Sequence, residues 1–220
     1  MPGLRNNTVE FLVNLSKNNN REWFQANRNS YELANADFQQ LVFTLIAGIS
    51  HFDKSIGALD PRDCIFRIYR DVRFSANKNP YKENFGAFIA PGGRKSNRCG
   101  YYIHIQPGGS FASGGLYMAP TPVMKQARMA MVDNRSEFLS IINNPKFKST
   151  FTWEGVEQVK RTPAGFQFDS ELDLFLRLKH ITPSYDFADE VLVQCGFHLK
   201  AIEVFETLSP LVKFLNQAIQ

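Results

Sequence analysis

The residues best suited to chemistry in this chain lie in one basic segment, residues 67–82, which reads Arg-Ile-Tyr-Arg-Asp-Val-Arg-Phe-Ser-Ala-Asn-Lys-Asn-Pro-Tyr-Lys. Its five basic residues and single aspartate give a formal charge of +4, which equals the net charge of the whole 220-residue chain. Like charges at this spacing repel each other, so water, an internal carboxylate or an anionic ligand must offset the repulsion. The charge pattern therefore predicts a site for an anion.

The three arginines define the chemistry of the predicted site. Guanidinium groups bind carboxylate or phosphate oxygens through two parallel hydrogen bonds. In a strand, Arg67 and Arg73 point to one face and Arg70 points to the other, so the three converge only if the chain turns near Arg70. Asp71 would then orient the arginines and leave donors free for a ligand.

Aromatic side chains alternate with these cations. Pro80 stiffens a polar loop in which local hydrogen bonds from Ser and Asn side chains would hold Lys78 in place. The rings of Tyr69 and Tyr81 suit a nucleotide or a single-stranded nucleic acid, because rings stack on bases while cations hold phosphates. The predicted ligand-binding residues are Arg67, Tyr69, Arg70, Asp71, Arg73, Lys78, Tyr81 and Lys82.

Three hypotheses stay open for the function of this segment. The first is binding of a phosphate-bearing or polyanionic ligand, for which an anionic small molecule or nucleotide is preferred over nucleic acid. The second is an enzyme acting on such a ligand, with Asp71 or His104 as the catalytic proton-transfer group. The third is a structural or interaction protein whose arginines pair with carboxylates from distant helices. A second basic loop, residues 92–98, either extends the site or is simply solvated.

The elements that must position this segment belong to an α+β fold. Apolar residues at three-and-four spacing predict helices at both ends of the chain, and alternating segments in the middle predict a mostly antiparallel sheet. We expect one domain over residues 1–220. The predicted helices are residues 8–15, 21–49, two between 121 and 145, 172–178 and 197–219; the predicted strands are Cys64–Tyr69, Asn84–Ala90, Tyr101–Gln106 and Phe111–Met118.

Particular residues should end these elements or set their faces. Thr8 is expected to cap the first helix, and Pro210 to break or kink the last. Within residues 101–106, Tyr101, Ile103 and Ile105 share one face, predicted to be core, while His104 lies on the opposite polar and aromatic face.

Composition limits the class of protein. The chain is 44% apolar with 20 Phe, so it can bury a large core. Three scattered cysteines suggest a reducing compartment, and no CxxC or HxxxH spacing indicates a metal site, so we predict neither a metal nor a cofactor. No signal peptide is evident, and the longest apolar run, Leu41–Ile49, is too short to cross a bilayer. These features predict a soluble, cytoplasmic protein with no membrane partner.

The basic segment also resembles the signature of a protein family. Arg67-x-x-Arg70-Asp71-x-Arg73-Phe74, followed by Asn77-Lys78 and Tyr81, is similar to the motif of an uncharacterised family, domain of unknown function 2461. Further similar motifs are Asn19-Asn20-Arg21-Glu22-Trp23-Phe24, Gly100-Tyr101-Tyr102, Pro107-Gly108-Gly109 and Gly114-Gly115-Leu116-Tyr117. The resemblance implies membership over nearly the whole chain and implies no activity, cofactor or partner.

Overall fold

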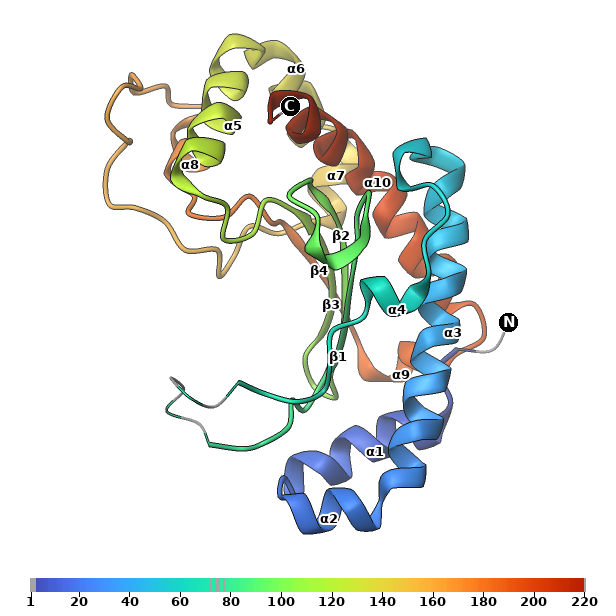
Figure 1. Cartoon of the computed structure of the whole chain (residues 1–220). Helices are drawn as coiled ribbons and strands as arrows, with labels where there is room; N and C mark the ends of the chain where they lie inside the picture. The colour runs from blue at the N-terminus through green and yellow to red at the C-terminus, as the bar shows by residue number, and fades with distance from the viewer. Residues whose placement is uncertain (1–2, 72, 74–75, 77, 220) are drawn as a thin grey trace.

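The computed structural model describes residues 3–71, 73, 76 and 78–219, and they form a single α+β domain (Figure 1). Helices precede and follow a central sheet, as predicted. The helices are α1 Asn6–Lys17, α2 Arg21–Ala26, α3 Arg28–Phe52, α4 Pro61–Cys64, α5 Thr121–Asp133, α6 Arg135–Ile142, α7 Pro145–Thr150, α8 Asp173–Arg177, α9 Asp189–Leu192 and α10 Phe197–Ala218, with short 3-10 turns at Lys54–Ile56 and Gly93–Lys95.

Four antiparallel strands make the sheet, in the order β1 Phe85–Ile89, β2 Gly100–Ile105, β3 Ser110–Gly115 and β4 Ser184–Phe187. α3 and α10 lie on one face of it (Figure 1). The predicted core residues Tyr101, Ile103 and Ile105 are fully buried on this face. A Cβ on Gly114 would overlap the Gly100 carbonyl oxygen on the neighbouring strand and lie 2.8 Å from the Leu208 side chain of α10, which explains a glycine inside this strand.

The N-terminal helices differ from the prediction at two points. The helix expected over residues 21–49 is divided at Asn27 into α2 and α3, because the Asn27 backbone leaves the helical region. Thr8 does not cap α1; its hydroxyl donates to the Asp37 carboxylate at 2.6 Å and so ties α1 to α3. The Asn20 side chain caps α2 by accepting from the Trp23 amide.

Two strand predictions were wrong. Residues 64–69 form only isolated pairings, because Cys64 ends α4 and the following segment meets the sheet at Ile65 opposite Ala87. β4 was missed because its four residues include an exposed Asp and carry little apolar alternation. Pro210 also does not break α10, since it lies exposed inside the continuous helix.

The molecule is C-shaped in Figure 1. The chain between α4 and β1 extends away from the sheet on the side opposite α3, and α5, α8 and the loops around α8 project from the other end on that same side. The face of the sheet opposite α3 and α10 lies toward the hollow between these two projecting parts. No helix among the described residues is long and apolar enough to span a membrane.

Candidate functional site

The basic segment forms part of a projecting arm, here called the basic arm, which comprises the described residues 65–71, 73, 76 and 78–82. The chain runs out and back beside itself, with the Arg70 amide donating to the Pro80 carbonyl at 2.9 Å and the Lys82 amide to the Ile68 carbonyl at 2.7 Å. Tyr69 and Tyr81 face each other across the arm in an antiparallel pairing. Arg67 and Arg70 therefore lie on one side of the arm, beside the returning segment that carries Lys82.

Two arginines of the arm lie close enough to Lys82 to influence its charge. The Lys82 ammonium lies 5.5 Å from the centre of the Phe66 ring. Burial lowers the pKa of Lys82, and the positive charges of Arg67 and Arg70 lower it further. Within the part of the chain that the structure describes, no ion pair includes any of these three residues. We call Arg67, Arg70 and Lys82 the cation cluster.

Asp71 pairs with one arginine only. Its carboxylate accepts from the Arg73 guanidinium at 2.6 and 2.9 Å, and both side chains are exposed. Hydrogen bonds from Arg73 lower the pKa of Asp71 to about 2, with a smaller contribution from the charge of Arg67. A carboxylate that stays ionised near neutral pH is a poor proton donor, so this geometry argues against Asp71 as a catalytic acid.

The remaining predicted residues separate in the structure. Lys78 lies exposed on the outer part of the arm, while its predicted neighbours Phe74, Ser75 and Asn77 lie outside the described residues. Tyr69 is 42% exposed. Tyr81 is only 3% exposed, and its ring stacks on Phe24 at 3.9 Å between centroids. The structure thus makes Tyr81 a core residue, whose ring is not accessible to a ligand.

An asparagine from the N-terminal helices holds the arm. The Asn19 side chain, between α1 and α2, donates to the Tyr81 carbonyl and accepts from the Tyr81 amide, each at 3.1 Å, and also donates to Glu83 at 2.9 Å. It therefore pairs with the arm as a neighbouring strand would. The sequence interpretation missed this role, although Asn19 falls in one of the family-like motifs together with Phe24.

Replacing Asn19 with alanine should loosen the arm. Both backbone groups of the buried Tyr81 would lose their partner, which we expect to cost about 1–3 kcal/mol of the free energy of unfolding. Urea denaturation would measure the loss, and hydrogen exchange should show faster exchange of the Tyr81 amide. Asn18→Ala is the control, because the Asn18 side chain bonds only to the exposed Asn14 carbonyl; an equal loss in both variants would contradict the anchoring role.

Polar and aromatic side chains occupy the sheet face that looks into the hollow. The Tyr102 hydroxyl donates to His104 Nδ1 at 2.9 Å, and His104 Nε2 donates to the Gln106 side-chain oxygen at 3.0 Å. The Asn84 amide lies 3.4 Å from His104 Nδ1. A Cβ on Gly86 would come within 2.7 Å of the Tyr102 hydroxyl, so a larger residue there would displace the Tyr102 ring from this network. The network fixes His104 as a neutral ring with both nitrogens engaged.

His104 should make the stability of the protein depend on pH. Burial lowers the pKa of His104 below its ordinary value, and the hydrogen bond to Gln106 offsets this only in part. As the pH falls through about 6.5, His104 takes up a proton in the unfolded chain before it does so in the folded protein. The free energy of unfolding is therefore highest above that pH and falls as the pH drops toward the lower folded-state pKa. We expect His104→Gln to reduce the fall in the free energy of unfolding between about pH 7.5 and 5.5. Urea denaturation at both pH values tests this, and the exposed His51→Gln variant should keep the wild-type fall.

The loop at residues 92–98 does not join the arm. It follows the end of β1 at Ile89, whereas the arm precedes the start of this strand at Phe85. The Arg94 guanidinium donates to the Arg62 carbonyl at 2.6 Å, which ties the loop to α4. The second basic loop therefore lies at the opposite end of β1.

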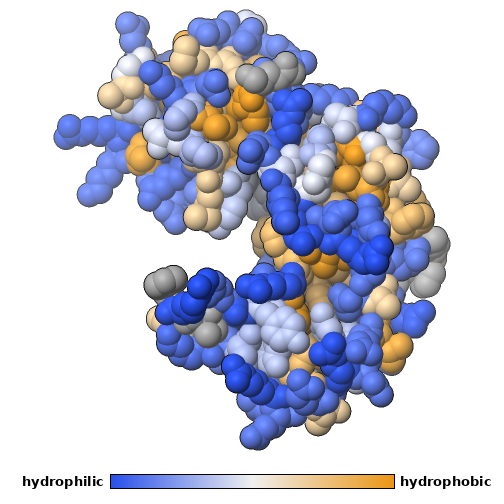
Figure 2. All heavy atoms as spheres, viewed as in Figure 1, coloured by the Kyte–Doolittle hydropathy of each residue, from blue (hydrophilic) through white to orange (hydrophobic). Residues whose placement is uncertain are grey.

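Figure 2 shows the surface hollowed between the arm and the part of the molecule that carries α5 and α8. Lys82 of the cation cluster lies beside Phe66, whose ring is 6.3 Å from that of Tyr102 on the polar face of β2. Among the described residues, no group of three or more His, Cys, Asp or Glu side chains is placed to hold a metal ion.

Fold and site together define a class of protein. It is a single α+β domain in which α3 and α10 cover one face of the sheet, and a basic arm lies beside the other face, whose polar and aromatic side chains are half-buried. The chain belongs to the family described as conserved hypothetical protein (DUF2461), whose model matches residues 7–214. This confirms the family that the motifs predicted. Searches of curated proteins and of solved structures found no match to the chain.

Proposed function

We propose that this protein binds a phosphate-bearing or otherwise polyanionic ligand at the cation cluster. The observation that supports this most is the position of Lys82, which is partly buried beside the Phe66 ring on a segment whose backbone pairs with the segment that carries Arg67 and Arg70. The charges of both arginines lower the pKa of Lys82. Bringing like charges together in a partly desolvated place costs free energy, and a bound anion would offset that cost. The ligand would remove the repulsion that the folded chain retains.

The arginines and the lysine would contact a phosphate in different ways. Arg67 and Arg70 supply planar guanidinium forks that match two oxygens of one phosphate, while Lys82 supplies a compact point charge. Arg73, held by Asp71, and Lys78 extend the positive charge along the outer arm, where further phosphates of a polyanion would lie. Tyr69 is partly exposed, and its ring lies beside those of Phe24 and Tyr81.

The proposal includes a cytoplasmic location, where phosphorylated metabolites and nucleic acids are abundant. It is supported by the three free cysteines, of which Cys64 and Cys99 are buried.

A thermal-shift screen tests the proposal. Purified protein would be heated with inorganic phosphate, pyrophosphate, nucleotides, sugar phosphates and short oligonucleotides, beside the Arg70→Ala variant. A ligand that binds only the folded state must raise the unfolding midpoint. We expect at least one of these anions to raise the midpoint of the wild type and to have little effect on the variant; no shift from any of them would contradict the proposal.

A further inference from the structure

We propose that the ligand is a single-stranded nucleic acid, whose bases stack on the open face of the sheet while its phosphates contact the basic arm. This inference rests on the proposed function and adds the class of ligand. The rings that we assign to base stacking are Phe66, Phe88, Tyr102 and Phe111, here called the aromatic floor.

The aromatic floor is continuous across the arm and the first three strands. The Phe66 and Tyr102 rings lie 6.3 Å apart, and the Tyr102 and Phe111 rings lie 5.7 Å apart. Phe88 stands directly opposite Tyr102 in the register of β1 and β2. All four rings are partly exposed, although the covered face of the same sheet buries its large apolar residues. The ring planes are inclined, by 66° between Phe66 and Tyr102 and by 52° between Tyr102 and Phe111, so each partly exposed ring offers a separate stacking position.

Helices do not shield this floor as they shield the opposite face. α3 and α10 lie to the right of the sheet in Figure 1, and the floor is on the opposite face, toward the hollow that Figure 2 shows. An aromatic surface left open beside a charged arm indicates a ligand that carries both planar and anionic groups.

The cations lie where the phosphates of such a ligand would be. Lys82 lies against the ring of Phe66 at one end of the floor, and Arg67 and Arg70 continue from it along the arm. Bases on the floor would therefore place their backbone beside the cation cluster. The side-chain amides of Asn84 and Gln106, next to the rings, offer hydrogen bonds to base edges.

The chemistry of the floor favours unpaired bases over other polyanions. A bare phosphate or polyphosphate would leave the rings without contacts, and a duplex keeps the faces of its bases stacked inside the helix. Stacking on protein rings and cation contacts to the backbone are the usual combination in proteins that bind single strands. The ring of Tyr81, expected from the sequence to stack on a base, lies in the core, and the floor supplies rings in its place.

Fluorescence anisotropy with labelled oligonucleotides tests the inference. The probes are single-stranded DNA and RNA of about fifteen nucleotides, and an abasic chain of the same length that keeps the phosphates and lacks the bases. We expect wild-type protein to bind the base-bearing strands at least tenfold more tightly than the abasic chain. Because this comparison needs no variant, it does not depend on the folding of any substituted protein.

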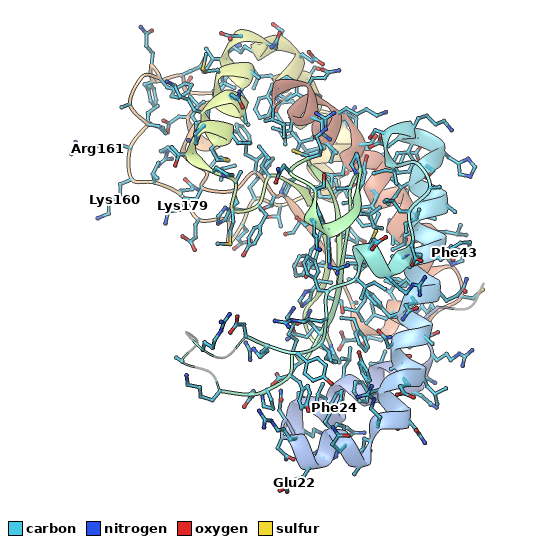
Figure 3. All side chains as sticks on the ribbon, viewed as in Figure 1. Glu22, Phe24, Phe43, Lys160, Arg161 and Lys179 are labelled. Carbon is cyan, nitrogen blue, oxygen red and sulfur yellow. The ribbon has the colours of Figure 1, made fainter. Side chains whose placement is uncertain are left out.

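Variants of the aromatic floor test whether the bases bind at these rings. Phe111→Leu and Phe88→Leu should each weaken binding of the base-bearing strands about tenfold and leave binding of the abasic chain unchanged. Phe111→Tyr keeps the ring and should keep the affinity. Phe43→Leu is the control, because Phe43 is 56% exposed on α3, away from the hollow (Figure 3).

The outcomes separate this inference from the proposed function. Equal affinity for abasic and base-bearing strands would overturn the inference, and so would floor variants that bind like the wild type. In either case the proposed function still holds if binding depends on Arg70. Failure of every oligonucleotide, with pyrophosphate still bound through Arg70, would do the same. If neither pyrophosphate nor any strand binds, both proposals are wrong.

Discussion

The double variant Arg67→Ala/Arg70→Ala should lose at least a hundredfold in affinity for pyrophosphate or for an oligonucleotide, measured by isothermal titration calorimetry. Each charge-assisted hydrogen bond contributes roughly 1.5–3 kcal/mol, and about 1.4 kcal/mol corresponds to a factor of ten. Its stability should stay within roughly 0.5 kcal/mol of the wild type, because neither side chain forms an ion pair with a described residue. This variant should therefore lose affinity for the anion while its free energy of unfolding stays close to that of the wild type.

A charge-matched variant distinguishes a site from general attraction. Lys125 and Lys148 are exposed on α5 and α7, and replacing both by alanine removes the same formal charge. Binding should be almost unchanged in this control. If the control loses as much affinity as the arm variant, the anion responds to net charge alone. If the arm variant instead unfolds far more easily than the wild type, the arginines hold the fold together, as the structural hypothesis requires.

Replacing Phe24 with alanine should have the largest effect on stability. Phe24 is fully buried, and its ring stacks on Tyr81 and contacts Phe11 and Tyr31. Removing a buried phenyl ring from such a cluster costs about 3–5 kcal/mol, which for a chain of this length lowers the unfolding midpoint by roughly 6–20 °C. Differential scanning calorimetry would measure the shift.

The same substitution should also weaken anion binding well below the unfolding midpoint, because Tyr81 then loses the ring that holds the arm in place. Phe43→Ala removes the same kind of side chain from an exposed position on α3, which Figure 3 shows on the outside of the molecule, and should change stability by less than about 0.5 kcal/mol. An anion affinity unchanged in Phe24→Ala would mean that the arm does not depend on this packing.

The sequence predicts the basic segment well and its geometry only in part. Charge counting finds Arg67, Arg70 and Lys82 because it needs no three-dimensional information. Strand alternation places Tyr101 in the core and His104 on the other face, since a period of two holds along a regular strand. The same rule fails in the arm, where the chain forms isolated pairings and Tyr81 turns inward onto Phe24.

Long-range contacts explain what the sequence left out. Asn19 contacts Tyr81 and Glu83 from more than sixty residues away, and no local pattern indicates such a pairing. The division of the long N-terminal helix at Asn27 is similar, because the helix period continues through the break. The aromatic floor combines Phe66 from the arm with Tyr102 and Phe111 from two strands, so it exists only once the sheet has formed.

NMR mapping of anion binding tests the central claim most directly. Spectra of the ¹⁵N-labelled protein, including the arginine Nε–H signals, would be recorded during titration with pyrophosphate. The proposal predicts that the largest shifts occur at the side chains of Arg67 and Arg70 and at the Lys82 amide, with smaller shifts along the arm. Saturable shifts confined to other parts of the chain, or no shifts at millimolar pyrophosphate, would contradict an anion site at the cation cluster.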